Sequence, residues 1–118
     1  MKKHRIAILS GILIGLGSLS ATSLHAMDFS RGDPNDDGSR NIADAIYMVN
    51  FLYLDGPTPG CLDAADVNDD GTINVADVIF ALSSFAHGAP FPMPVPLPDF
   101  CGPDPTPDSL SCVSYSCP

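Results

Sequence analysis

The chain has 118 residues, enough for one small domain, and its formal charge is −9 at pH 7. All fourteen acidic residues are aspartates, whereas lysine and arginine together number only five. This balance excludes functions that depend on a basic surface, such as binding nucleic acid or anionic lipid. Without glutamate, and without a Ser/His/Asp or Cys/His set, the sequence also argues against an enzyme.

The N-terminus has the layout of a secretory signal peptide. A basic start, an apolar run and a small-residue cleavage region follow one another: Lys2, Lys3 and Arg5, then 6–19, then 20–26. We expect cleavage after Ala26, with Ala21 as the alternative, and a secreted, periplasmic or cell-surface protein. Losing three cations takes the formal charge from −9 to −12. A membrane anchor is the competing interpretation, but the apolar run is short for a span.

Residues 33–44 and 66–77 share a twelve-residue pattern of oxygen-bearing side chains. Positions 1, 3, 5, 9 and 12 hold aspartate or asparagine in both segments, and position 6 is glycine. Ca²⁺ loops use this alternation, with glycine allowing a sharp turn and position 7 offering its carbonyl. A single acidic run is usually a solvated loop. A repeat displaced by 33 residues, with every ligand position filled, predicts two calcium sites.

Each loop is expected to lead directly into one helix. Apolar residues recur at helical spacing after both loops, and an asparagine suited to capping precedes each run (Asn41, Asn74). The first helix should end near Leu54 and the second near His87, with a single helical turn at 61–65 between them. The predicted fold class is all-α and small, with two loop–helix units packed antiparallel about a pseudo-twofold axis.

The helical spacing also predicts which side chains are buried. Ile46 and Val49, and Ile79 and Leu82, should face the partner helix. The helix starts, with one aromatic residue each, should remain partly exposed as candidate docking faces: Ile42, Ala43 and Tyr47, and Val75, Ala76 and Phe80.

The segment after the second helix is rich in proline and cysteine. Proline alternates with apolar residues over 91–98, which predicts extended chain. We expect a strap across the helix pair that covers the second-helix face and leaves Tyr47 free, with residues 101–118 forming an irregular knob. A stiff linker or a peptide ligand is the alternative. The expected divisions of the chain are 1–26, 27–88 and 89–118.

All four cysteines follow the signal segment. An even number in a small exported chain predicts two disulfides, and no pair has the spacing of zinc ligands. We expect Cys61–Cys101, since it closes a long loop and so constrains the unfolded chain most, and Cys112–Cys117.

The tandem loops, the single helix after each loop and the aspartate at position 12 resemble a type I dockerin, over about residues 32–88. An ordinary EF-hand has a helix before its loop and a glutamate at position 12. Residues 101–117 are similar to tails on dockerin-like repeats of secreted bacterial proteins, notably of planctomycetes. The resemblance implies calcium-dependent folding and docking onto a cohesin-like module or another scaffold, often in polysaccharide breakdown.

Carried over by position, the resemblance implies two calcium ions with six ligand residues each. These are Asp33, Asn35, Asp37, Ser39, Asn41 and Asp44, and Asp66, Asn68, Asp70, Thr72, Asn74 and Asp77, with Ser39 and Thr72 using backbone oxygen. Positions 10 and 11, often Ser-Thr where dockerins contact cohesin, are Ile-Ala and Val-Ala here. Position 8 of the first loop is Arg40 instead of an apolar residue, so we expect that loop to pack less well and bind calcium more weakly.

These features predict a secreted, non-catalytic docking module that is monomeric when unbound and has no membrane segment once the signal is removed. The alternative is a stand-alone structural or calcium-buffering exported protein without a cohesin partner.

Overall fold

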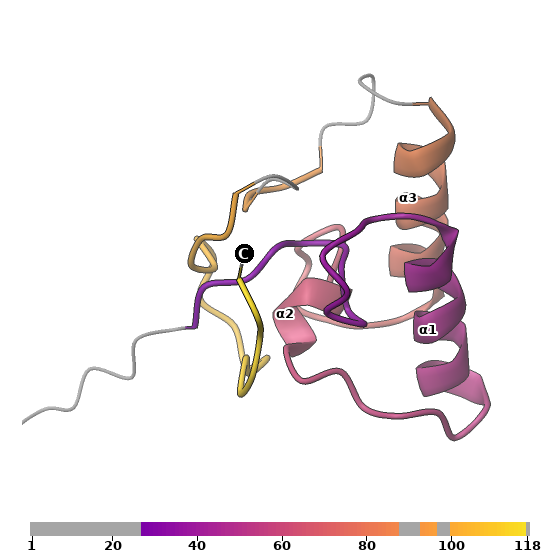
Figure 1. The fold of residues 1–118 in the computed structure, drawn as a ribbon, viewed down its shortest axis with the longest axis horizontal. Helices are drawn as coiled ribbons and strands as arrows, with labels where there is room; N and C mark the ends of the chain where they lie inside the picture. The colour runs from indigo at the N-terminus through magenta and orange to yellow at the C-terminus, as the bar shows by residue number, and fades with distance from the viewer. Residues whose placement is uncertain (1–26, 88–92, 97–99, 118) are drawn as a thin grey trace, which may run out of the picture.

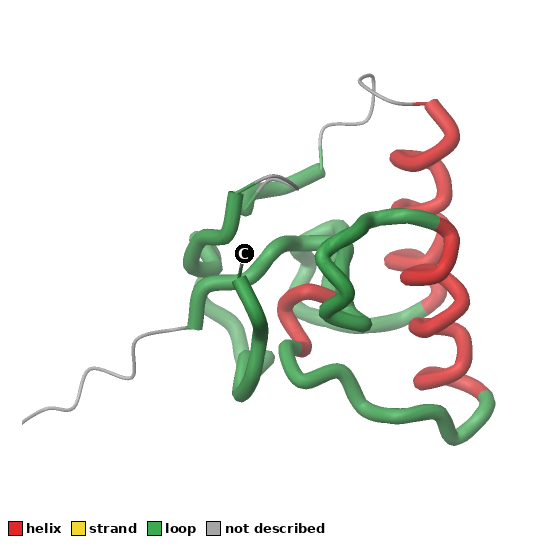
Figure 2. The backbone as a smooth tube through the Cα atoms, viewed as in Figure 1, coloured by secondary structure: helices red, strands yellow, loops and turns green. Residues whose placement is uncertain are grey.

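A computed structural model describes residues 27–87, 93–96 and 100–117. This part of the chain contains the helices α1 (Ile42–Tyr53), α2 (Leu62–Ala65) and α3 (Val75–His87), joined by loops and turns and without a strand (Figure 2). The predicted all-α class is confirmed, and the two long helices end where expected. The expected signal peptide lies outside the described residues. Among the helices described, none has the length and hydropathy needed to cross a membrane.

Local signals explain where α1 begins and ends. The Asn41 side chain accepts a hydrogen bond from the Ala43 N–H, and the Asp44 carboxylate accepts one from the Asn41 N–H, which completes a capping box. At the other end, Asp55 adopts a positive φ of 54°, and the Gly56 N–H bonds back to the Asn50 carbonyl at 2.8 Å. The helix therefore stops at the linker that the sequence marks with Asp-Gly-Pro.

The core lies where α1 and α3 pack against each other and against the chain between them. Its buried members are Ala45 and Met48 from α1, Val78 and Ala81 from α3, and Ala65, Val67 and Met93. Figure 1 shows α1 and α3 together at one side, with α2 and the yellow tail at the other side of the loops. Each long helix thus has a second buried face, directed at the loops instead of the other helix.

This arrangement corrects the predicted burial pattern. Ile46 is 54% exposed and Ile79 is 58% exposed, so neither is enclosed by the partner helix as expected, and Leu82 is also exposed. Val49 packs against the core as predicted. The reason is tertiary: Val67 and Met93 pack beside the helices, so the closely packed faces are turned toward them. Tyr47 and Phe80 are half-buried, in agreement with the expectation that both remain partly exposed.

The tail has no helix over 100–117 and packs on the N-terminal segment. Phe29 and Gly102 exchange two backbone hydrogen bonds of 3.0 Å each. Phe29, Cys61 and Ala64 form a second buried cluster, with Tyr115 packed against it. The tail is therefore part of the folded unit.

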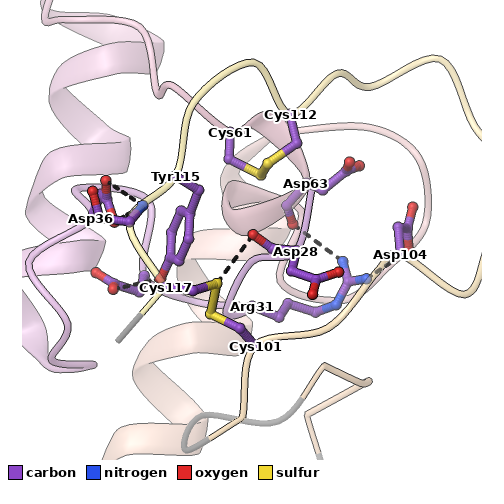
Figure 3. The surroundings of a disulfide bond; sticks show 12 residues. Asp28, Arg31, Asp36, Cys61, Asp63, Cys101, Asp104, Cys112, Tyr115 and Cys117 are labelled. Atoms are coloured by element: carbon purple, nitrogen blue, oxygen red, sulfur yellow. Dashed lines mark hydrogen bonds and ion pairs between the residues drawn. A yellow bond between two sulfur atoms is a disulfide. The ribbon is translucent and has the colours of Figure 1, made fainter. Parts of the chain in front are cut away.

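The predicted disulfide pairing is wrong. The bonds are Cys61–Cys112 and Cys101–Cys117, with sequence separations of 51 and 16 residues (Figure 3). The Leu62 N–H donates to the Ser111 carbonyl, so the returning chain brings Cys112, and not Cys101, beside the start of α2. The tail's return path fixes the pairing, and this path depends on contacts distant in sequence.

Candidate metal centres

The two loops fold in nearly the same way because they carry the same turn residues. Position 4 has a positive φ in both, 56° at Asp36 and 57° at Asp69, and so does the glycine at position 6, 78° at Gly38 and 80° at Gly71. A Cβ on Gly38 would meet nothing within 4 Å, so the left-handed backbone, and not crowding, is what requires glycine there. The repeated sequence therefore encodes a repeated backbone path.

Position 1 organises each turn through backbone donors. In the first loop the Asp37 and Gly38 N–H groups donate to the two oxygens of Asp33, at 3.2 and 3.0 Å. In the second loop the N–H groups of Asp70 and Gly71 donate to Asp66 in the same way, at 3.2 and 2.8 Å. Both position-1 carboxylates are almost fully buried inside their loops.

Three carboxylates converge in each loop. One oxygen from each lies within 4.8 Å of the others in the sets Asp33, Asp37 and Asp44, and Asp66, Asp70 and Asp77. Two unit charges at this separation repel by about 3 kcal/mol at an effective dielectric constant of 20. Such clusters need a cation or a proton to be stable at neutral pH.

The other expected ligand residues surround these carboxylates. Asn35 and Asn68, at position 3, each accept a hydrogen bond from the N–H at position 5 and donate to the carboxylate there. Ser39 and Thr72, at position 7, direct their N–H groups to that same carboxylate. Asn41 and Asn74, at position 9, cap the helices. All twelve residues lie in the two loops and the first turns of the helices.

Burial makes these carboxylates hard to ionise without a cation. It raises the pKa of Asp44 to about 7, with the charges of Asp33 and Asp37 adding to the effect and the Asn41 N–H opposing it. Burial also raises the pKa of Asp66 to about 6, although hydrogen bonds from the N–H groups of Gly71 and Asp70 act to lower it. Burial is also the main reason why the pKa of Asp77 is raised.

The residues present fit a calcium ion. The donors are oxygens, which Ca²⁺ prefers, and three of them in each loop carry negative charge. In addition, Asp44 Oδ1 is buried and has no hydrogen-bond partner. An unpaired buried carboxylate oxygen costs free energy, and coordination to a cation would remove that cost.

Sequence reasoning missed the part that the tail and one arginine play at these loops. The Tyr115 hydroxyl donates to Asp33 Oδ2 at 2.7 Å, and the Ser116 N–H donates to Asp36. The fully buried Arg31 donates to the backbone carbonyl of Asp66 at 2.6 Å. Arg31 could have been noticed as one of only two arginines or lysines after residue 26, whereas the Tyr115 contact has no local signal.

The family model of the dockerin type I domain matches residues 31–80, which include both loops, α1 and the start of α3. Dockerin domains are non-catalytic modules that bind calcium, dock onto cohesin partners and typically occur outside the cell. Comparison with curated proteins gives no match, and neither does comparison with solved structures. The repeated loops and the family match together identify residues 31–80 as a type I dockerin domain.

Proposed function

We propose that the protein is an exported, calcium-dependent docking module that binds a cohesin-type partner through the apolar face of α1 and α3. In this proposal residues 1–26 are a signal peptide, 27–88 are the docking domain and 89–118 are a stabilising tail. Two disulfides among the described residues support export, because such bonds persist in oxidising compartments.

The proposal assigns one calcium ion to each loop, held by the six residues expected from the sequence. The position-12 aspartates support this assignment because they lie in the first helical turns, with Asp44 also completing the cap of α1. Ion binding at Asp44 and Asp77 would therefore fix the start of each helix. The two loop–helix units are proposed to be antiparallel repeats, which would place the two helix starts at opposite ends of the helix pair.

An uncovered apolar groove between the helices carries the proposal. It has a volume of about 380 Å³. Its lining residues are Ile42, Ala45, Ile46, Val49, Asn50, Leu54, Val78 and Leu82. Ile79 and Val75 extend the exposed apolar surface along α3. An apolar face of this kind on an acidic chain suits a protein partner.

The role of such a module is to attach something to a scaffold, not to react with a substrate. The partner's assembly would supply any chemistry, and a polysaccharide-degrading complex is the setting that the family suggests. The chain is proposed to be monomeric until the partner covers the groove.

The test is calorimetric titration of the exported protein with a purified cohesin module, in calcium and in excess chelator. Ile46→Asp and Ile79→Asp should each weaken binding by more than about tenfold, because each buries a charge in the interface. Val113→Asp is the matched control, since Val113 is an equally apolar, exposed residue on the tail and outside the groove.

Binding that needs calcium and is lost only in Ile46→Asp and Ile79→Asp supports docking through the apolar face of α1 and α3. Equal affinity of all three variants would show that the groove is not the contact surface. No binding to cohesin modules, with calcium uptake intact, would favour the stand-alone structural or calcium-buffering function instead.

A further inference from the structure

The tail segment after Cys101 is held beside α2. Cys112 is bonded to Cys61, and the Leu62 N–H donates to the Ser111 carbonyl at 2.9 Å. Figure 3 shows Asp63 of α2 and Asp104 of the tail on the same side of Arg31. The covalent and backbone contacts therefore bring acidic residues from two distant parts of the chain together.

Asp63, Asp104 and Asp108 form a third carboxylate cluster, outside both sets of expected calcium ligands. One oxygen from each lies within 4.8 Å of the others. Asp63 is only 5% exposed, and its Oδ1 atom is buried with no hydrogen-bond partner. A buried carboxylate that has an unpaired oxygen and lies close to two further carboxylates is unfavourable unless a cation joins them.

Arg31 does not fill this role. Its guanidinium donates to the main-chain carbonyl of Asp63 at 3.2 Å and not to that residue's carboxylate. It also pairs with Asp104 Oδ1 at 2.9 Å, an atom that Thr106 contacts as well. Of the three carboxylates in the cluster, the guanidinium pairs only with Asp104, and it also lies 3.4 Å from Asp69.

Asp104 and Asp108 each keep one oxygen available to a metal. The hydrogen bonds to Asp104 fall on Oδ1, and Asp108 Oδ1 accepts from the Leu110 N–H at 2.8 Å, so neither Oδ2 has a donor among the described residues. Burial, followed by the charges of Asp104 and Asp108, raises the pKa of Asp63 to about 6, with Arg31 opposing. The site is therefore short of positive charge.

We propose that Asp63, Asp104 and Asp108 bind a third divalent cation, Ca²⁺, which links the tail to α2. The donors are oxygens only, which favours calcium over zinc. Asp63 closes the inner side of the site, while the exposed Asp108 leaves the outer side open to the waters that complete calcium coordination. The disulfide holds the segment in place before the ion binds.

The test counts calcium ions bound per chain by equilibrium dialysis of the exported, disulfide-bonded protein. Asp63→Asn and Asp108→Asn should each bind one ion fewer than the unaltered protein, or bind it more than about tenfold more weakly. Asp55→Asn is the control for charge, because Asp55 is exposed in the linker outside all clusters and asparagine tolerates its positive φ.

The test compares the number of calcium ions bound by each variant with the number bound by the unaltered protein. It therefore holds whether the loops bind two ions or fewer. Equal stoichiometry and affinity for Asp63→Asn, Asp108→Asn and Asp55→Asn would overturn the proposal. Asp69 adds a further check, since Asp66, Asp69 and Asp108 also approach within 4.8 Å. Loss of the ion in Asp69→Asn but not in Asp63→Asn would overturn the assignment to Asp63. If circular dichroism shows that Asp63→Asn disturbs the fold, the result for Asp108→Asn, at an exposed position, decides whether the proposal stands.

Discussion

The two loops have the same expected ligands but different surroundings. In the second loop, Val67 at position 2 is fully buried in the core and Ile73 at position 8 packs against it. In the first loop these positions are Pro34 and Arg40. Arg40 donates to the Arg31 carbonyl at 3.2 Å and contacts Met93 Sδ at 2.7 Å. Position 2 is buried in both loops, whereas position 8 is held by apolar packing in the second loop and by polar contacts in the first.

The position-12 aspartates of the two loops differ in their hydrogen-bond partners. Asp77 Oδ1 accepts the Asn68 N–H at 3.2 Å, whereas Asp44 Oδ1 has no partner. Asp33, the first-loop counterpart of Asp66, accepts a hydrogen bond from the hydroxyl of Tyr115 in the tail. A duplicated motif can therefore keep its ligands while each copy depends on different neighbours for its shape.

Removing calcium from both loops should have the largest effect. Excess chelator, with the disulfides reduced, should abolish most of the helical circular dichroism, because converging carboxylates then repel and the small core cannot offset this. Calcium at millimolar concentration, typical for extracellular modules, should restore the signal. An unchanged spectrum in chelator would show that packing alone holds the helices.

Removing one carboxylate from each loop comes next in size and compares the loops directly. Asp70→Ala should lower the melting temperature more than Asp37→Ala, because the second loop is continuous with the buried core at Val67. Each variant should weaken calcium binding in its own loop by more than about tenfold. Calorimetric melting at fixed calcium measures both. An equal fall in melting temperature would mean that the polar contacts of Arg40 replace apolar packing fully.

The sequence was sufficient to predict what depends on neighbouring residues. The spacing of oxygens identified the loops, and Asn41 predicted the start of α1 through its cap. The burial of Ile46 was mispredicted because a helical pattern cannot show that Met93, far along the chain, fills one side of the core. The disulfides were mispredicted because the pairing of Phe29 with Gly102 directs the tail back toward the N-terminus.

Acidification should affect the two loops differently, with a smaller effect than the loss of a carboxylate. Without metal, the folded chain holds protons on Asp44 and Asp66 up to about pH 7 and 6, while the unfolded chain releases them near 3.8. In the metal-free protein, the contribution of these two groups to the free energy of unfolding is therefore greatest below about pH 4. It is lost as the pH rises through 6 and 7.

With calcium the sign reverses, because protons compete for the same oxygens. Loop-one affinity should fall about tenfold per pH unit below pH 7, and loop-two affinity should begin to fall about one unit lower. Calcium titrations between pH 5 and 8, using Asp37→Ala and Asp70→Ala to isolate each loop, measure this. Parallel pH profiles would contradict the different pKa values of Asp44 and Asp66, about 7 and about 6.

The smallest expected effect is also the most specific to one loop. Tyr115→Phe removes the hydroxyl that donates to Asp33 Oδ2, and should weaken calcium binding in the first loop by roughly three- to tenfold. Thr106→Val is the matched control for the first loop, since the Thr106 hydroxyl donates to Asp69 and Asp104, neither of which is an expected ligand in either loop.

The comparison uses calcium titrations of both variants, each combined with a substitution that silences the other loop. A loss confined to Tyr115→Phe would show that the tail orients a first-loop ligand. Because Tyr115 packs against the cluster around Phe29 and Cys61, its ring must stay in place, and phenylalanine keeps that packing. If loop-one affinity does not change, the capping box at Asp44 and the backbone donors to Asp33 already hold that loop in shape, and the tail contributes only packing.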